Sequence, residues 1–164
     1  MQISIVLASM VFAGTALAGE LTRYPLPNNS TFPIAQAVEI PAGTTLVYHS
    51  GTTPQPANPD AERYSVEFWG DTETQTKSVF NRMQASLQNL GLGFGDVVKM
   101  TVFLVGTPEQ EGRLDFQGFM NAYTLHFGTE AQPNLPARSA VQVAGLAVPG
   151  MLVEIEVVLA RSAE

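Results

Sequence analysis

Arg138 and Glu154, near the C-terminal end of the chain, are the residues best suited to act on a small molecule. Arg138 follows Pro136 and precedes an apolar run, so we expect its guanidinium to be partly buried. A buried cation needs an anionic partner, and the planar guanidinium fork matches a carboxylate at two points. We expect Arg138 and Glu154 to lie on adjacent strands, where they would bind a ligand that carries a carboxylate.

Arg138 also has a purely structural interpretation, in which Glu154 or Glu156 is its partner in an ion pair. Both glutamates alternate with apolar residues between Val153 and Leu159, so their carboxylates are expected on the same face of a strand. The sequence leaves the ligand site and the ion pair as alternatives.

Composition limits the classes of protein to which the chain can belong. With 164 residues, 45% of them hydrophobic, it is long enough for one domain with a sizeable core. The net charge is -7 and lysine and arginine form no cluster, which argues against nucleic acid as a partner. There is no cysteine, and His49 and His126 lie far apart, so we expect no metal centre.

Residues 1–18 have the pattern of a signal peptide. The apolar segment 3–13 is too short to span a bilayer, and Ala16-Leu17-Ala18 matches the small-x-small pattern of a cleavage site. We therefore expect a secreted or periplasmic protein with no membrane span in its mature form; a buried N-terminal strand is the alternative. Residues 19–32 are predicted to form an extended arm, and residues 33–164 the folded domain.

Two segments have the apolar period of a helix that lies on a sheet. In residues 71–90, apolar side chains recur every three or four positions, Asp71 or Thr72 can cap the start, and Gly91 ends the run. Residues 116–127 carry aromatic side chains at the same spacing, which we interpret as core.

Strands are predicted before, between and after these helices. Residues 35–40 and 45–48 are expected to pair as a β-hairpin around Pro41-Ala42-Gly43, and residues 64–69 are a candidate edge strand. The remaining strands are predicted over residues 97–105, 138–146 and 152–160.

The resulting order is β-β-α-β-α-β-β, which predicts an α+β fold with a mixed sheet and both helices on one face. The other face of such a sheet would be bare, and bare apolar faces are usually hidden by assembly. The order therefore favours a closed homo-oligomer.

Five stretches of the chain also match, in order, the motifs of a known family. They are Leu87-Gln88-Asn89-Leu90-Gly91, residues 95–104, residues 119–123, Pro136-Ala137-Arg138-Ser139 and Val153-Glu154-Ile155-Glu156. From about Pro33 to Ala160 the chain resembles the RidA/YjgF family of reactive-intermediate deaminases. The resemblance implies a chorismate-mutase-like fold, assembled as a homotrimer with ligand clefts between subunits.

The resemblance also implies an activity. Members of the family hydrolyse enamines and imines of 2-oxo acids, such as 2-aminoacrylate and 2-iminopropanoate, to the 2-oxo acid and ammonia, without a cofactor. By this likeness Arg138 would bind the substrate carboxylate and Glu154 would activate the attacking water. Gly51 matches a glycine whose backbone approaches the ligand closely.

The chain departs from the family pattern near its N-terminal side. Ile34 stands where a ligand-facing tyrosine is usual, and Phe32 replaces the usual glycine before proline. One hydroxyl contact to the substrate is therefore expected to be missing, and Tyr48 is a candidate to replace it.

Two further departures concern the second helix and the strand of Arg138. Met120 replaces an asparagine, with Asn121 one position later on a different helical face, and Ala140 replaces a frequent cysteine. These changes keep two alternatives to a deaminase open: a trimeric protein that binds small carboxylates without reacting, and a holdase-like scaffold.

Overall fold

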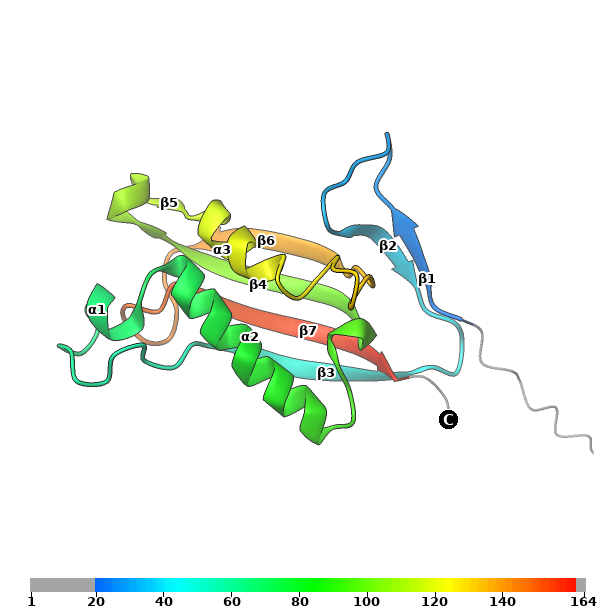
Figure 1. Ribbon diagram of the computed structural model, residues 1–164, viewed down its shortest axis with the longest axis horizontal. Coiled ribbons are helices and arrows are strands. Elements are labelled where there is room, and N and C mark those ends of the chain that lie inside the picture. Colours follow the sequence, from blue (N-terminus) through cyan, green and yellow to red (C-terminus); the bar gives the residue numbers. More distant parts are fainter. Residues whose placement is uncertain (1–19, 162–164) are drawn as a thin grey trace, which may run out of the picture.

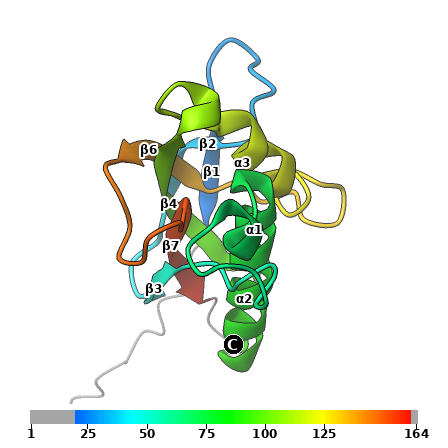
Figure 2. The same ribbon diagram turned by 90° about the vertical axis from the view of Figure 1, so that its left-hand side faces the viewer.

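The computed structural model describes residues 20–161, so the predicted signal peptide lies outside the described residues. A mixed sheet carries the α-helices on one side only (Figures 1 and 2). Within the described part of the chain, no helix has both the length and the apolar character needed to cross a membrane. The elements are β1 Thr22–Pro25, β2 Ala35–Glu39, β3 Thr45–Thr52, α1 Val66–Trp69, α2 Thr72–Asn89, β4 Val97–Thr107, β5 Arg113–Leu114, α3 Phe116–Tyr123, β6 Ala137–Val143 and β7 Val153–Arg161, with short 3-10 helices at Phe94–Asp96 and Pro108–Gln110.

Strand β4 lies at the centre of the sheet, whose order is β1-β2-β6-β4-β7-β3 with β5 paired to β4. It pairs in parallel with β6 and antiparallel with β7. Met100, Val102 and Leu104 of β4 are fully buried against the helices, whereas Lys99 and Thr101 point to the opposite side. The strict alternation that predicted this strand is therefore confirmed.

Helix α2 confirms the predicted cap and apolar stripe. Asp71 precedes the helix and accepts a hydrogen bond from the Thr74 backbone N–H at 2.8 Å, and Gly91 follows it in the left-handed conformation, with φ 67°. The buried face of the helix consists of Thr72, Gln75, Thr76, Val79, Phe80, Met83 and Leu87. This face covers β4 and β7 and so fixes one wall of the core.

The predicted hairpin of residues 35–40 and 45–48 is wrong. The turn exists, with Gly43 at φ 85°, but the two strands do not pair with each other. Strand β2 pairs with β1 and β6, while β3 pairs with β7 at the opposite edge of the sheet. Local sequence determines the turn, but the strands that pair are chosen by long-range packing.

The predicted edge strand over residues 64–69 is wrong, because this segment contains α1, Val66–Trp69. Ser65 caps the helix by accepting from the Phe68 N–H at 3.1 Å. Ordered structure also begins before Pro33, since β1 lies inside the segment expected to be an arm and pairs antiparallel with β2. Arg23 fastens β1 by donating to the backbone carbonyls of Val97, Leu135 and Gly95.

The face of the sheet away from the helices is called the open face below. It is formed by Tyr48 of β3, Lys99, Thr101 and Phe103 of β4, Val141 of β6, and Glu154, Glu156 and Val158 of β7. No helix of the described chain lies over it (Figure 2). The expected mixed sheet with helices on one face is thus confirmed.

Candidate functional site: a caged arginine and a glutamate on opposite faces

Arg138 lies on the covered face of the sheet, beneath α3. It pairs in register with Met100 of β4, so its side chain points toward the helices. Four aromatic rings surround the guanidinium, called the aromatic cage below. Their centroids lie 4.2 Å (Tyr123), 5.0 Å (Phe119), 5.4 Å (Phe32) and 5.9 Å (Phe116) from Arg138 Cζ, within the range of cation–π attraction.

In the part of the chain that the structure describes, no carboxylate pairs with the guanidinium of Arg138. Its Nη1 is buried without a hydrogen bond, and its Nη2 donates to a weak acceptor, Sδ of Met120, at 3.4 Å. Among residues 20–161, the only ion pair joins Lys77 to Glu73, so the predicted structural pairing of Arg138 with a glutamate is not formed within the chain.

Burial lowers the pKa of Arg138 below its ordinary value, while the nearby Tyr123 opposes that change. Burial also raises the pKa of Tyr123 to about 12, so its hydroxyl stays neutral and donates to the Pro33 carbonyl at 2.8 Å. Arg138 therefore remains a cation in apolar surroundings, and an anionic ligand would relieve the cost of its burial.

Glu154 lies on the open face. It pairs in register with Phe103 of β4, as the alternation of β7 predicted. Its carboxylate packs against the backbone of Gly51, where a Cβ atom would overlap Glu154 Oε1. The irregular pairing of β3 between His49 and Thr52 places Gly51 there, so the glycine is needed for close approach to the carboxylate.

Arg138 and Glu154 are not on adjacent strands, and this prediction is wrong. Strands β6 and β7 follow one another along the chain, but in the sheet β4 lies between them. Arg138 points to the covered face and Glu154 to the open face. A single chain therefore does not bring the two side chains into one cavity.

The other predicted site residues divide between the two faces. Ala140 pairs with Val102 on the covered face, two residues beyond Arg138 and packed against the core. Tyr48 is 77% exposed on the open face and lines a cavity of about 290 Å³. Sequence reasoning missed Lys99 and Thr101, which line the same cavity as Glu156; their alternation within β4 was the available signal.

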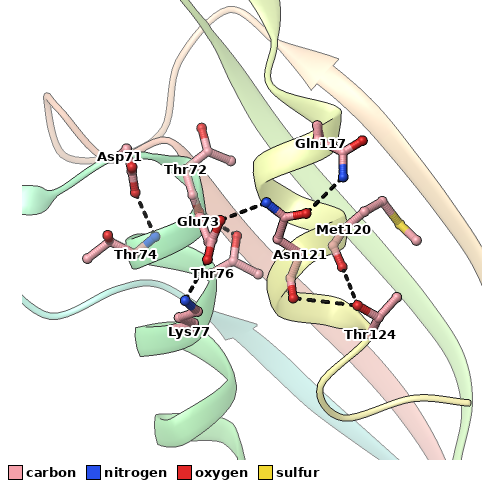
Figure 3. Close-up of polar contacts among 10 residues, drawn as sticks. All are labelled: Asp71, Thr72, Glu73, Thr74, Thr76, Lys77, Gln117, Met120, Asn121 and Thr124. Carbon is pink, nitrogen blue, oxygen red and sulfur yellow. Dashed lines mark hydrogen bonds and ion pairs between the residues drawn. The ribbon is translucent and has the colours of Figure 1, made fainter. Parts of the chain in front are cut away.

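Met120 and Asn121 confirm the expected difference in helical face (Figure 3). The Met120 thioether points toward Arg138, whereas Asn121 points toward α2 and donates to Glu73 Oε2 at 2.8 Å. Gln117 donates to the Asn121 side-chain oxygen, also at 2.8 Å. Asn121 is therefore occupied by a contact between helices and supplies no polar group to Arg138.

The chain is similar to a known family and to several known proteins. A family model described as "Endoribonuclease L-PSP" matches residues 29–161. The chain is 39% identical to "Putative regulator AldR" of Lactococcus lactis over 69% of this chain and 77% of that protein. It is 31% identical to "Putative reactive intermediate deaminase TdcF" of Escherichia coli over 80% of this chain and 88% of that protein.

Solved structures show the same arrangement of elements. Escherichia coli TdcF with bound serine has a TM-score of 0.54 at 31% identity, covering 81% of this chain and 91% of that one. RidA from an Antarctic Psychrobacter has a TM-score of 0.54 at 29% identity, covering 80% of this chain and 91% of that one. The α+β fold predicted from the sequence is thus also found in related structures.

Proposed function

Because the chain belongs to the RidA/YjgF family, whose model is described as endoribonuclease L-PSP, we propose that it hydrolyses 2-imino acids to 2-oxo acids and ammonia. The observation that carries the proposal is the partly buried Arg138 guanidinium, which has a free Nη1 and no anion in the described chain. A carboxylate is the group that fits it best. The relative TdcF binds serine, which also carries a carboxylate.

In the proposed reaction, Arg138 holds the substrate carboxylate and thereby positions the imine carbon. Glu154 accepts a proton from water as the water oxygen bonds to that carbon. That proton passes to the nitrogen, which gives a carbon bearing both OH and NH₂. The hydroxyl proton then moves to the nitrogen as the C–N bond breaks, so R–C(=NH)–COO⁻ plus H₂O becomes R–CO–COO⁻ plus NH₃. An enamine such as 2-aminoacrylate first gains a proton on its terminal carbon and loses one from its nitrogen, which gives the imine.

The proposal requires more than one copy of the chain. Since Arg138 and Glu154 face opposite sides of one sheet, we propose that a homotrimer combines Arg138 of one copy with Glu154 of its neighbour. The exposed Tyr48 and Val141 give the open face apolar area that assembly would remove from water. Light scattering of the purified protein would test this, with a monomer at micromolar concentration counting against it.

The decisive experiment measures ammonia and pyruvate release from freshly generated 2-aminoacrylate. We expect acceleration by the wild type, a loss of about 100-fold or more in Arg138→Ala, and a similar loss in Glu154→Gln, which keeps the shape of the side chain but not its basicity. Tyr64→Phe, which removes a hydroxyl from an exposed side chain outside the aromatic cage, is the control. Normal turnover by Arg138→Ala would disprove the anchor role.

A second candidate function is carriage of a small carboxylate without reaction. The apolar Met120 beside Arg138 favours it, because no polar side chain there would orient a reacting nitrogen. In that case pyruvate would raise the melting temperature of the wild type but not of Arg138→Ala, and no ammonia would be released. Against an endoribonuclease activity, the net charge of -7 disfavours a phosphate backbone.

We further propose export, on the signal-like pattern of residues 1–18. Mass spectrometry of the protein expressed from its full reading frame would show a mature chain beginning at Gly19. A cytoplasmic protein that still carries residues 1–18 would refute export.

A further inference from the structure

Phe32 covers the guanidinium of Arg138 from the side of the solvent. Its ring stacks on Phe116, with centroids 6.3 Å apart and planes at 18°. Both of these phenylalanines are 39% exposed, whereas Phe119 and Tyr123 are fully buried. The aromatic cage therefore has two inner rings that belong to the core and two outer rings that separate the cation from water.

A carboxylate cannot reach Nη1 of Arg138 while the outer rings stay in place, because that nitrogen has no exposed surface. The two outer rings are not held equally. Phe116 begins α3, directly after its N-cap Asp115, while Phe32 lies in the irregular segment between β1 and β2. Rotation of the Phe32 side chain is thus the smaller rearrangement.

The displaced Phe32 ring has a place to go. It forms part of the wall of a cavity of about 370 Å³ between the β1–β2 segment and residues 133–135. Leu26, Ile34 and Leu135 give this cavity apolar lining. The cavity lies beside the cage and gives the ring room. Arg138 is not among its lining residues, and the cation that does line it, Arg23, already donates to three backbone carbonyls.

We propose that Phe32 is a specificity-determining residue, which selects 2-imino and 2-oxo acids with aromatic or large apolar side chains over three-carbon acids. The inference depends on Arg138 as the carboxylate anchor proposed above. Opening the cage breaks the stacking of Phe32 on Phe116 and its contact with the guanidinium. A small acid replaces neither contact. An apolar side chain on the bound acid packs against Phe116 and Met120 in place of the ring.

Calorimetric titration with two product-like acids tests this inference without requiring turnover. The probes are pyruvate and 2-oxo-4-phenylbutanoate, added to wild type, Phe32→Ala, Phe32→Leu and Arg138→Ala. We expect the wild type to bind the aromatic acid about tenfold more tightly than pyruvate. In Phe32→Ala the preference narrows to about twofold, mainly because pyruvate binds more tightly once no ring must move.

Leu125→Ala is the matched control, since Leu125 is 61% exposed and lies outside the cage; it should keep the wild-type preference. Phe32→Leu keeps apolar bulk without a flat ring and should give an intermediate preference. This second variant still tests the inference if Phe32→Ala does not fold. An unchanged preference in both Phe32 variants, or equal affinity of the wild type for the two acids, would overturn the role of Phe32.

The outcome also separates this inference from the proposed reaction. If both acids bind with the predicted preference, Arg138→Ala loses both, and no imine is hydrolysed, then the deaminase proposal fails while the role of Phe32 stands. If neither acid binds the wild type or Phe32→Ala, the anchor role of Arg138 and the role of Phe32 fail together.

Discussion

The two faces of the sheet are built from the same strands but place polar groups in opposite surroundings. On the covered face, Met100, Val102 and Leu104 are fully buried, and the guanidinium of Arg138 lies among aromatic rings without an anion from residues 20–161. On the open face, Lys99 and other polar side chains stand in contact with water. The cation lies where its burial costs most.

This difference supports the proposal that Arg138 binds a ligand rather than stabilises the fold. A guanidinium on the open face would cost little free energy, since water would satisfy its donors. In the aromatic cage its Nη1 lacks any partner, and such groups cost about 1–3 kcal/mol. Functional sites commonly carry such local instability.

The largest expected effect contrasts core truncation on the two faces. Phe80 of α2 is fully buried, so Phe80→Ala should lower the free energy of unfolding by about 3–5 kcal/mol. Val141 of the open face is 43% exposed, so Val141→Ala should change it by about 0.5 kcal/mol or less in the dissociated chain. Urea titrations at low and high protein concentration would measure both. A large loss for Val141→Ala at low concentration would contradict the distinction between the faces.

The next effect is a gain of stability. Arg138→Met replaces the unpaired cation of the covered face with an apolar side chain of similar length, and should raise the free energy of unfolding by about 1–2 kcal/mol. The same variant should lose all affinity for carboxylates. Urea denaturation and calorimetry would measure the two quantities; a destabilised Arg138→Met protein would mean that the guanidinium has a partner in the assembly.

A smaller effect concerns the cap that positions α2 on the covered face. Hydrogen bonds from Thr74 hold the pKa of Asp71 below its ordinary value, so the stabilisation is present above the unfolded carboxyl pKa of about 3.9 and is lost as the pH falls through the folded pKa. Asp71→Ala should therefore cost about 1 kcal/mol at pH 7. The difference between the two proteins should shrink below about pH 4. A pH-independent difference would argue against the charged cap.

The smallest effect on stability is expected on the open face. Gly51→Ala forces only the end of the Glu154 side chain to move, so it should change the free energy of unfolding by about 0.5 kcal/mol or less while turnover falls. Gly145→Ala, where a Cβ would meet no atom within 4 Å, is the matched control and should keep full turnover. Equal turnover by the two variants would show that the position of Glu154 does not matter.

Several parts of the site could be predicted from the sequence, and they are the locally encoded ones. The face shared by Glu154 and Glu156 follows from alternation, and the separation of Met120 from Asn121 follows from helical geometry. The pairing of β2 and β3 could not be predicted, because a turn at Gly43 is compatible with strands that diverge afterwards. The covering of Arg138 by Phe32 joins residues 106 positions apart, and no local pattern reports such a contact.

The sequence by itself determined the cap and buried stripe of α2, the alternation of β4, and the presence of an arginine in apolar surroundings. These depend on contacts between residues a few positions apart, whose geometry the backbone fixes. Only the tertiary structure decided that β4 separates β6 from β7, that Arg138 and Glu154 face opposite sides, and that Phe32 closes the cage. Strand order and ring packing depend on competition among distant partners, which is resolved when the whole core forms.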